Sequence, residues 1–245
     1  MADGLTPYHT FSKLYDHWMD PVLYEKWAEF FKKRVSAGSS VLDLGCGTGH
    51  LGVHLTKDGY SYTGIDISED MLTLAKVKQD DNQLEFPLIL RDMCDLSDLG
   101  HFDAIVSFCD TLCYLKTPAD VQKVFAEVYN HLNIGGYFLF DVHSLFQMEQ
   151  FDGFSYHDKD DKQLLLWDTF AGDEPHSCEH YLTILKQKQG RMYERYDEMH
   201  YERTYPLEQL KEWLYAAGFT QIKCTANFTE PVTEKSLRIF FEVRK

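Results

Sequence analysis

Val41-Leu42-Asp43-Leu44-Gly45-Cys46-Gly47-Thr48-Gly49-His50 is an apolar run followed directly by three alternating glycines. The apolar run predicts a short strand over residues 40–44, and the pattern that follows predicts a helix over residues 51–57. Glycines at a strand-to-helix junction let the backbone turn sharply and let a ligand approach without a Cβ in the way. The junction therefore predicts a ligand site at the end of a strand in an α/β fold.

The chain on both sides of this junction alternates between strand and helix patterns. Strand-like runs cover residues 60–65, 84–90, 102–108 and 137–142, and helical patterns cover residues 69–78 and 118–132. Strands that alternate with helices in this way predict a mostly parallel sheet with helices on both faces. We therefore expect an α/β, Rossmann-like domain.

The pattern changes after residue 150. Runs of period two cover residues 163–170, 178–188 and 191–205, with Gly190 at the position of a hairpin turn. A helix over residues 207–217 follows, and strands over 220–227 and 236–243 are close enough to form a hairpin. We expect one domain, formed by residues 1–149 and 205–245, with a small antiparallel β insertion over residues 150–204.

The glycine spacing argues against a nicotinamide cofactor. The dinucleotide fingerprint would need its third glycine at the position of His50. Asp43 stands two places before the first glycine, where a carboxylate suits an ammonium group, or a role in bracing the loop, better than it suits a pyrophosphate. This pattern favours a cationic ligand.

The run Asp43-Leu-Gly45-Cys-Gly47-Thr-Gly49 resembles motif I of the class I S-adenosylmethionine-dependent methyltransferases. The resemblance implies a seven-stranded sheet whose last strand is antiparallel, with S-adenosyl-L-methionine as the cofactor. It assigns Asp66, at the end of the next strand, to the ribose hydroxyls, because Ser68 is the better helix N-cap and leaves Asp66 free. The cofactor-binding residues that it implies are Asp43, Gly45, Cys46, Gly47, Asp66, Ile67, Asp92, Met93 and Cys109.

The beginning of the chain resembles a narrower group. Helical spacing over residues 11–35, interrupted by Pro21, predicts two helices. The run Tyr15-Asp-His-Trp-Met19 is similar to the helical lid of a bacterial subgroup of small methyltransferases. This likeness implies that residues 1–36 form a lid and that Tyr15 lies over the cofactor.

Two residues are candidates for catalysis. Open α/β sheets bind ligands at the carboxyl edge of the strands, and both His143 and Asp110 follow predicted strands there. Each has a structural alternative, because Asp110 can be a turn residue and His143 can bond to its own turn. Residues 191–205 place mixed charge and tyrosine on both faces of a strand, so this strand is either part of a solvated sheet or part of a lid over the acceptor.

We expect no bound metal. His50 and His54 share one helical face but lack a third ligand, and His176-Ser-Cys178-Glu-His180 falls in an expected hairpin connection without a partner cluster.

Composition limits the partners and the compartment. The net charge of −15 and the pI near 5.1 disfavour a nucleic acid partner. Six scattered cysteines indicate reduced thiols, and neither a signal peptide nor a membrane span is encoded, so we expect a cytoplasmic protein. The oligomeric state cannot be read from these patterns.

The sequence as a whole predicts an S-adenosylmethionine-dependent methyltransferase that acts on a small molecule, with the insertion as a substrate cap. The segment Cys109-Asp-Thr-Leu-Cys113 differs from the Asn/Asp-Pro-Pro-aromatic motif of base-amine methylation. An RNA- or protein-directed methyltransferase and a non-catalytic S-adenosylmethionine-binding protein remain as alternatives.

Overall fold

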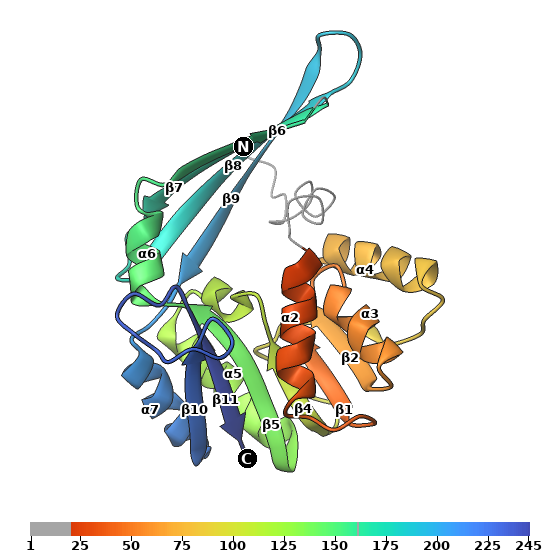
Figure 1. Ribbon diagram of the computed structural model, residues 1–245, viewed down its shortest axis with the longest axis vertical. Coiled ribbons are helices and arrows are strands. Elements are labelled where there is room, and N and C mark those ends of the chain that lie inside the picture. The colour runs from red at the N-terminus through yellow and green to blue at the C-terminus, as the bar shows by residue number, and fades with distance from the viewer. Residues whose placement is uncertain (1–20, 161) are drawn as a thin grey trace.

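The computed structural model describes residues 21–160 and 162–245, which form two β-sheets and the helices around them (Figure 1). The larger sheet has seven strands in the order β10-β11-β5-β4-β1-β2-β3. Its strands are β1 (Ser40–Leu44), β2 (Ser61–Asp66), β3 (Leu88–Leu90), β4 (Phe102–Ser107), β5 (Leu132–His143), β10 (Gln221–Ala226) and β11 (Arg238–Arg244).

The pairing in this sheet is parallel except at one side. β1 through β5 pair in parallel, whereas β11 lies antiparallel between β5 and β10. The last strand thus inserts between β5 and β10 and is antiparallel to both, with Arg238 opposite His143. The predicted Rossmann-like fold class, including its antiparallel last strand, is confirmed.

Helices cover both faces of the sheet because each presents an apolar stripe to it. α2 (Pro21–Lys32) and α3 (His50–Lys57) bury Phe31 and Leu55 in one core cluster. α5 (Pro118–His131) and α7 (Leu207–Ala217) bury Phe125 and Leu214 in the cluster on the other face. α4 (Glu69–Asp81) and the short helix η1 (Thr111–Tyr114) follow β2 and β4, so both begin at the carboxyl edge of the sheet.

The second sheet is antiparallel and extends away from the first (Figure 1). It contains β6 (Ser155–Lys159), β7 (Gln163–Ala171), β8 (Ser177–Gln187) and β9 (Tyr193–Arg203), and α6 (Leu145–Phe151) precedes it. The turn at Gly190 joins β8 to β9, as the sequence predicts. β6 and α6 were not predicted, because β6 is almost entirely exposed and polar and because α6 is too short to show a helical period.

Three further expectations need correction or lie outside the described residues. β3 is shorter than predicted, because Leu84 N donates to Gln79 O and the Gln79 side chain donates to Phe86 O, which ties this segment to α4. Cys178 and His180 lie within β8 rather than in a connection. Tyr15 and any helix before residue 21 lie outside the described residues. The domain limits at residues 149 and 205 stay a prediction.

In the part of the chain that the structure describes, no helix is both long enough and apolar enough to span a bilayer.

Candidate active site

The glycine-rich turn after β1 is a tight backbone structure. Gly45, Gly47 and Gly49 have φ values of 73°, 54° and 76°, in the left-handed region that favours glycine. The amides of Gly45 and Cys46 both donate to Ile65 O at 2.9 Å, which fixes the turn against β2. A Cβ on Gly45 would lie 2.2 Å from Thr111 Cγ2. The turn therefore lies directly against η1, at the end of β4.

Asp66 ends β2 and holds this turn. Its Oδ2 accepts from Gly47 N at 2.8 Å, and its Oδ1 accepts from Ser68 N at 2.9 Å. Ser68 caps α4, as predicted, by accepting from Met71 N. The sequence analysis expected Asp66 to be free, but both of its oxygens already accept backbone amides. Each oxygen keeps a second lone pair, and ribose hydroxyls would use these.

Burial affects the two carboxylates of this region in the same direction. Burial raises the pKa of Asp66, although the amides that donate to it partly oppose the effect. Burial also raises the pKa of Asp43 to about 7, against the lowering effect of the Tyr62 hydroxyl, which donates to Asp43 Oδ2 at 2.6 Å. Asp43 is thus placed to brace β1 against β2 from inside the core.

The remaining residues predicted to bind the cofactor lie around this turn or after β3. Cys46 is buried, and a Cβ at Gly64 would lie 2.8 Å from its Sγ. Ile67 follows Asp66 and is 69% exposed, so its apolar surface at the strand end is not covered. Asp92 is exposed and accepts from Cys94 N at 2.8 Å, and Met93 packs against the core. Together they place an apolar surface and acceptor groups near a turn that a ligand can approach closely.

The carboxyl end of β4 has an unusual backbone. Cys109 and Asp110 both have positive φ values, 58° and 52°, although neither is glycine. Two successive residues of this kind are costly and persist only when their surroundings hold them. Asp141 on β5 stabilises this backbone conformation. Its Oδ1 accepts from Cys109 N at 3.0 Å, and its Oδ2 accepts from Asp110 N at 3.1 Å.

Asp141 also accepts from two side chains, those of Trp27 and Arg238. The sequence analysis assigned no role in the site to Asp141, Trp27 or Arg238. Trp27 Nε1 donates to Asp141 Oδ1 at 3.0 Å, and Arg238 Nη1 donates to Asp141 Oδ2 and to Asp110 Oδ1. Asp141 is fully buried within the apolar run of β5. A single acidic residue in such a run was the available signal, since a buried carboxylate requires partners.

His143, the last residue of β5, lies at the same edge. Its Nε2 is 2.9 Å from Asp110 Oδ2 and 3.4 Å from Glu202 Oε2. Burial lowers the pKa of His143, but the carboxylates of Asp110 and Glu202 outweigh it, so the pKa is raised. Burial likewise raises the pKa of Asp110, but Arg238 and His143 outweigh it and lower that pKa. The structure thus brings together the two predicted catalytic candidates.

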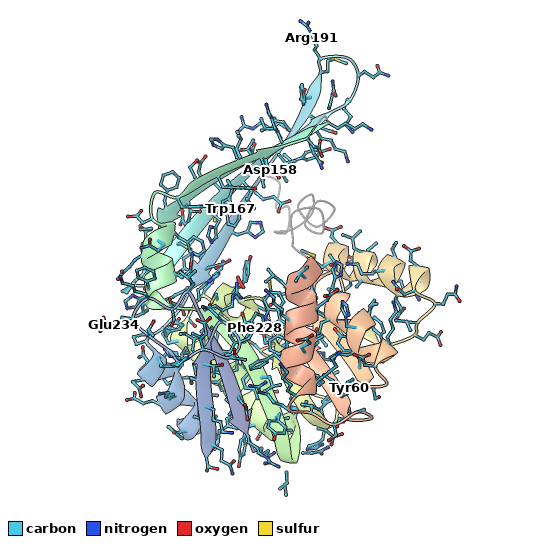
Figure 2. The ribbon with its side chains drawn as sticks, in the orientation of Figure 1. Tyr60, Asp158, Trp167, Arg191, Phe228 and Glu234 are labelled. Atoms are coloured by element: carbon cyan, nitrogen blue, oxygen red, sulfur yellow. The ribbon has the colours of Figure 1, made fainter. Side chains whose placement is uncertain are left out.

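Glu202 comes from β9 and links the two sheets. Its Oε1 is 3.7 Å from Nε2 of His180, which lies on β8, and its Oε2 faces His143. The alternation along β9 buries His200 and Glu202 on one face while Arg195 and Met199 are exposed on the other. In Figure 2, Arg191 marks the tip of this sheet far from the larger one, and Trp167 lies much closer to it.

Two groups of these side chains have a spacing that could hold a metal ion. They are Cys178, His180 and Glu202, and Asp110, His143 and Glu202. In the first group, Trp167 Nε1 donates to His180 Nδ1 at 3.1 Å. A neutral His180 that accepts at Nδ1 carries its proton on Nε2, which faces Cys178 and Glu202. This hydrogen-bond pattern disfavours a metal at His180 Nε2.

Comparisons with known proteins agree with this arrangement. A family model described as "Methyltransferase domain" matches residues 41–136, from β1 to the first half of β5. A Geobacillus protein named "Putative methyltransferase" is 37% identical over 245 residues, covering 97% of this chain and 99% of its own length.

Two further similarities concern a shorter segment and the whole fold. An N,N-dimethyltransferase of Streptomyces venezuelae, named for a dTDP-linked trideoxy amino sugar, is 36% identical over 109 residues, 44% of each chain. The crystal structure of an S-adenosylmethionine-dependent methyltransferase from Clostridium acetobutylicum superimposes with a TM-score of 0.84 at 27% identity and covers 96% of both chains. The chain therefore belongs to the class I S-adenosylmethionine-dependent methyltransferases and uses S-adenosyl-L-methionine as its cofactor.

Proposed function

We propose that this methyltransferase acts on a small molecule held between the carboxyl edge of the seven-stranded sheet and the four-stranded sheet. The observation that carries this proposal is the contact of Glu202, on β9, with His143 at the end of β5, 3.4 Å apart. Residues 150–204 thereby bring a side chain of their own to the sheet edge where α/β folds bind their ligands. This geometry supports a role for the insertion as a substrate cap.

Two further observations support a small acceptor. The Streptomyces relative is named for an amino sugar substrate, and its similarity includes 44% of this chain. The net charge of −15 disfavours an RNA acceptor, because a phosphate backbone would be repelled unless one face were locally basic.

The chemistry requires positioning more than covalent machinery. S-adenosylmethionine supplies an activated methyl group when it is bound, so the protein mainly orients the acceptor and excludes water. In our proposal the turn from Gly45 to Gly47 and the side chains of Asp66 and Ile67 hold the cofactor, together with Asp92 and Met93. Asp43 and Cys46 support that turn from the core.

The acceptor side of the proposed site starts at the end of β4. Cys109 would lie beside the methyl group of a bound cofactor, and Asp110 and His143 would face the acceptor. Asp110 raises the pKa of His143, which favours the charged form of the imidazole, and in our proposal the pair orients the acceptor.

Calorimetric titration tests the cofactor site. Protein freed of co-purified cofactor is titrated with S-adenosylmethionine, with S-adenosylhomocysteine and, as a control, with NADH. We expect binding of the first two only. Asp66→Ala should weaken S-adenosylmethionine binding by about 30- to 1000-fold, since charge-assisted, desolvated hydrogen bonds contribute about 2–4 kcal/mol.

Glu69→Ala is the matched control, because Glu69 is an exposed carboxylate three residues further along the chain. It should leave the affinity unchanged. Equal affinities of the Asp66→Ala and wild-type proteins would show that the cofactor site is misplaced.

A further inference from the structure

Glu202 has a carboxylate oxygen without a hydrogen-bond donor. Its side chain is only 7% exposed, and among the described residues no group donates to Oε2. The nearest candidate, His143 Nε2 at 3.4 Å, carries a single proton that faces the closer Asp110 Oδ2 at 2.9 Å. A buried acceptor without a donor is costly and requires an explanation, and a ligand that supplies the donor is one.

The charges around Glu202 do not balance. The buried carboxylates are those of Asp110, Asp141 and Glu202, and the cations that face them are Arg238 and, when protonated, His143. Even with a protonated His143 the group has one negative charge in excess.

His180 does not supply the missing positive charge. Its Nδ1 accepts from Trp167 Nε1, whereas an imidazolium would carry a proton on that nitrogen. Among the described residues, no third cationic group therefore faces these carboxylates.

Two side chains of this group are partly exposed at the sheet edge. The side chains of Asp110 and His143 are 14% and 10% exposed; Asp110 follows β4, which is next to β1, and His143 ends β5. Thr111, next to Asp110, is the residue that a Cβ on Gly45 would strike. A ligand at Asp110 and His143 therefore lies next to the proposed cofactor site.

We propose that the methyl acceptor is a primary or secondary amine and that Glu202 Oε2 accepts an N–H group from it. This inference rests on the proposed function and specifies its substrate class. A carboxylate or phosphate acceptor would meet the excess negative charge, whereas an amine supplies both the missing donor and, as the reaction proceeds, the missing positive charge.

The reaction is balanced without a further reagent. The amine reacts as its free base, after its ammonium form has lost a proton to solvent. The nitrogen lone pair forms the N–C bond, the S–C bond breaks, and its electron pair stays on sulfur. The positive charge moves from sulfur to nitrogen, where the carboxylates of Glu202 and Asp110 stabilise it.

A test with matched ring compounds distinguishes the acceptor classes. The S-adenosylhomocysteine complex, with its histidine side chains isotopically labelled, is titrated with cyclohexylamine, cyclohexanol and cyclohexanecarboxylate while the His143 resonances are followed by NMR. We expect a saturable shift with the amine only. Glu202→Gln should weaken amine binding at least tenfold, whereas Glu179→Gln, on the other face of the same sheet, should not.

Several outcomes would overturn this inference. The first is that the wild-type protein responds to the alcohol or to the carboxylate as strongly as to the amine. The second is that it does not respond to the amine. The third is that the purified wild-type protein contains one equivalent of metal and the Glu202→Gln protein does not. The comparison of the three compounds on wild-type protein stands even if Glu202→Gln fails to fold. Failure to bind S-adenosylhomocysteine would refute the proposed cofactor site, whereas failure with the amine alone would refute only the substrate class.

Discussion

The two halves of the carboxyl edge are built in different ways. At β1 and β2, Asp66 holds the glycine turn through backbone amides, and its partners lie 19 and 2 residues away in the sequence. At β4 and β5, buried charged side chains hold the edge, and Arg238 pairs with Asp110 across 128 residues. A site built from a backbone turn is encoded in one short motif, whereas a site built from buried charges is encoded in polar residues scattered along the chain.

The largest expected effect tests whether buried charges hold the β4 end. Asp141→Ala removes the acceptor of Trp27 Nε1, Cys109 N, Asp110 N and Arg238. Since this breaks a buried ion pair and leaves buried donors without their acceptor, we expect the free energy of unfolding to fall by about 3–5 kcal/mol in urea denaturation.

Asp58→Ala is the control for this variant. It breaks the exposed pair with Lys32 and should cost less than about 1 kcal/mol. Similar losses of unfolding free energy in the Asp141→Ala and Asp58→Ala proteins would mean that buried charges do not hold the β4 end.

A smaller effect tests the place where the two halves touch. Gly45→Ala would put a Cβ 2.2 Å from Thr111 Cγ2 on a backbone with a φ of 73°. Steric overlap and left-handed strain together should lower the free energy of unfolding by about 1–3 kcal/mol, as measured by urea denaturation.

Two companion variants separate these contributions. Gly38→Ala has a similar φ of 84° but open space around the new Cβ, so it reports the strain alone. Adding Thr111→Ser to Gly45→Ala removes Cγ2, can keep the hydroxyl bond to Phe108 O, and should recover part of the loss. Equal losses of unfolding free energy in the Gly38→Ala and Gly45→Ala proteins would show that steric contact between the two halves does not contribute.

The smallest effect is the pH dependence that His143 gives to the charged half. Asp110 and Glu202 raise the pKa of His143, so its contribution to stability is fully present below its unfolded pKa of about 6.5. That contribution is lost as the pH rises through the folded pKa. The difference in unfolding free energy between wild type and His143→Gln should therefore be largest at acidic pH and should shrink as the pH rises.

His157→Gln is the control for this measurement, because it removes an exposed histidine of β6. A difference between wild type and His143→Gln that stays constant from pH 5 to pH 9 would contradict the raised pKa.

Much of the fold could be predicted from local patterns, and the exceptions have physical causes. Apolar strands, the helix cap at Ser68 and the hairpin at Gly190 each depend on residues close together in the sequence. β6 and α6 lacked a periodic apolar signal, and β3 was shortened by the side chain of Gln79, a contact that periodicity does not show. Asp66 was placed correctly at its strand end, but its bonds to Gly47 and Ser68 depend on how the turn closes.

The sequence by itself determined the glycine turn, the family and the cofactor, because a strand, three glycines and a following helix are contiguous. It also nominated Asp110 and His143, because strand ends are recognisable. Only the tertiary structure decided that Asp141 and Arg238 hold Asp110, and that Glu202 from the second sheet reaches His143. The physical reason is that a buried charge selects its partners by distance in the folded chain, and those partners lie on strands far apart in sequence.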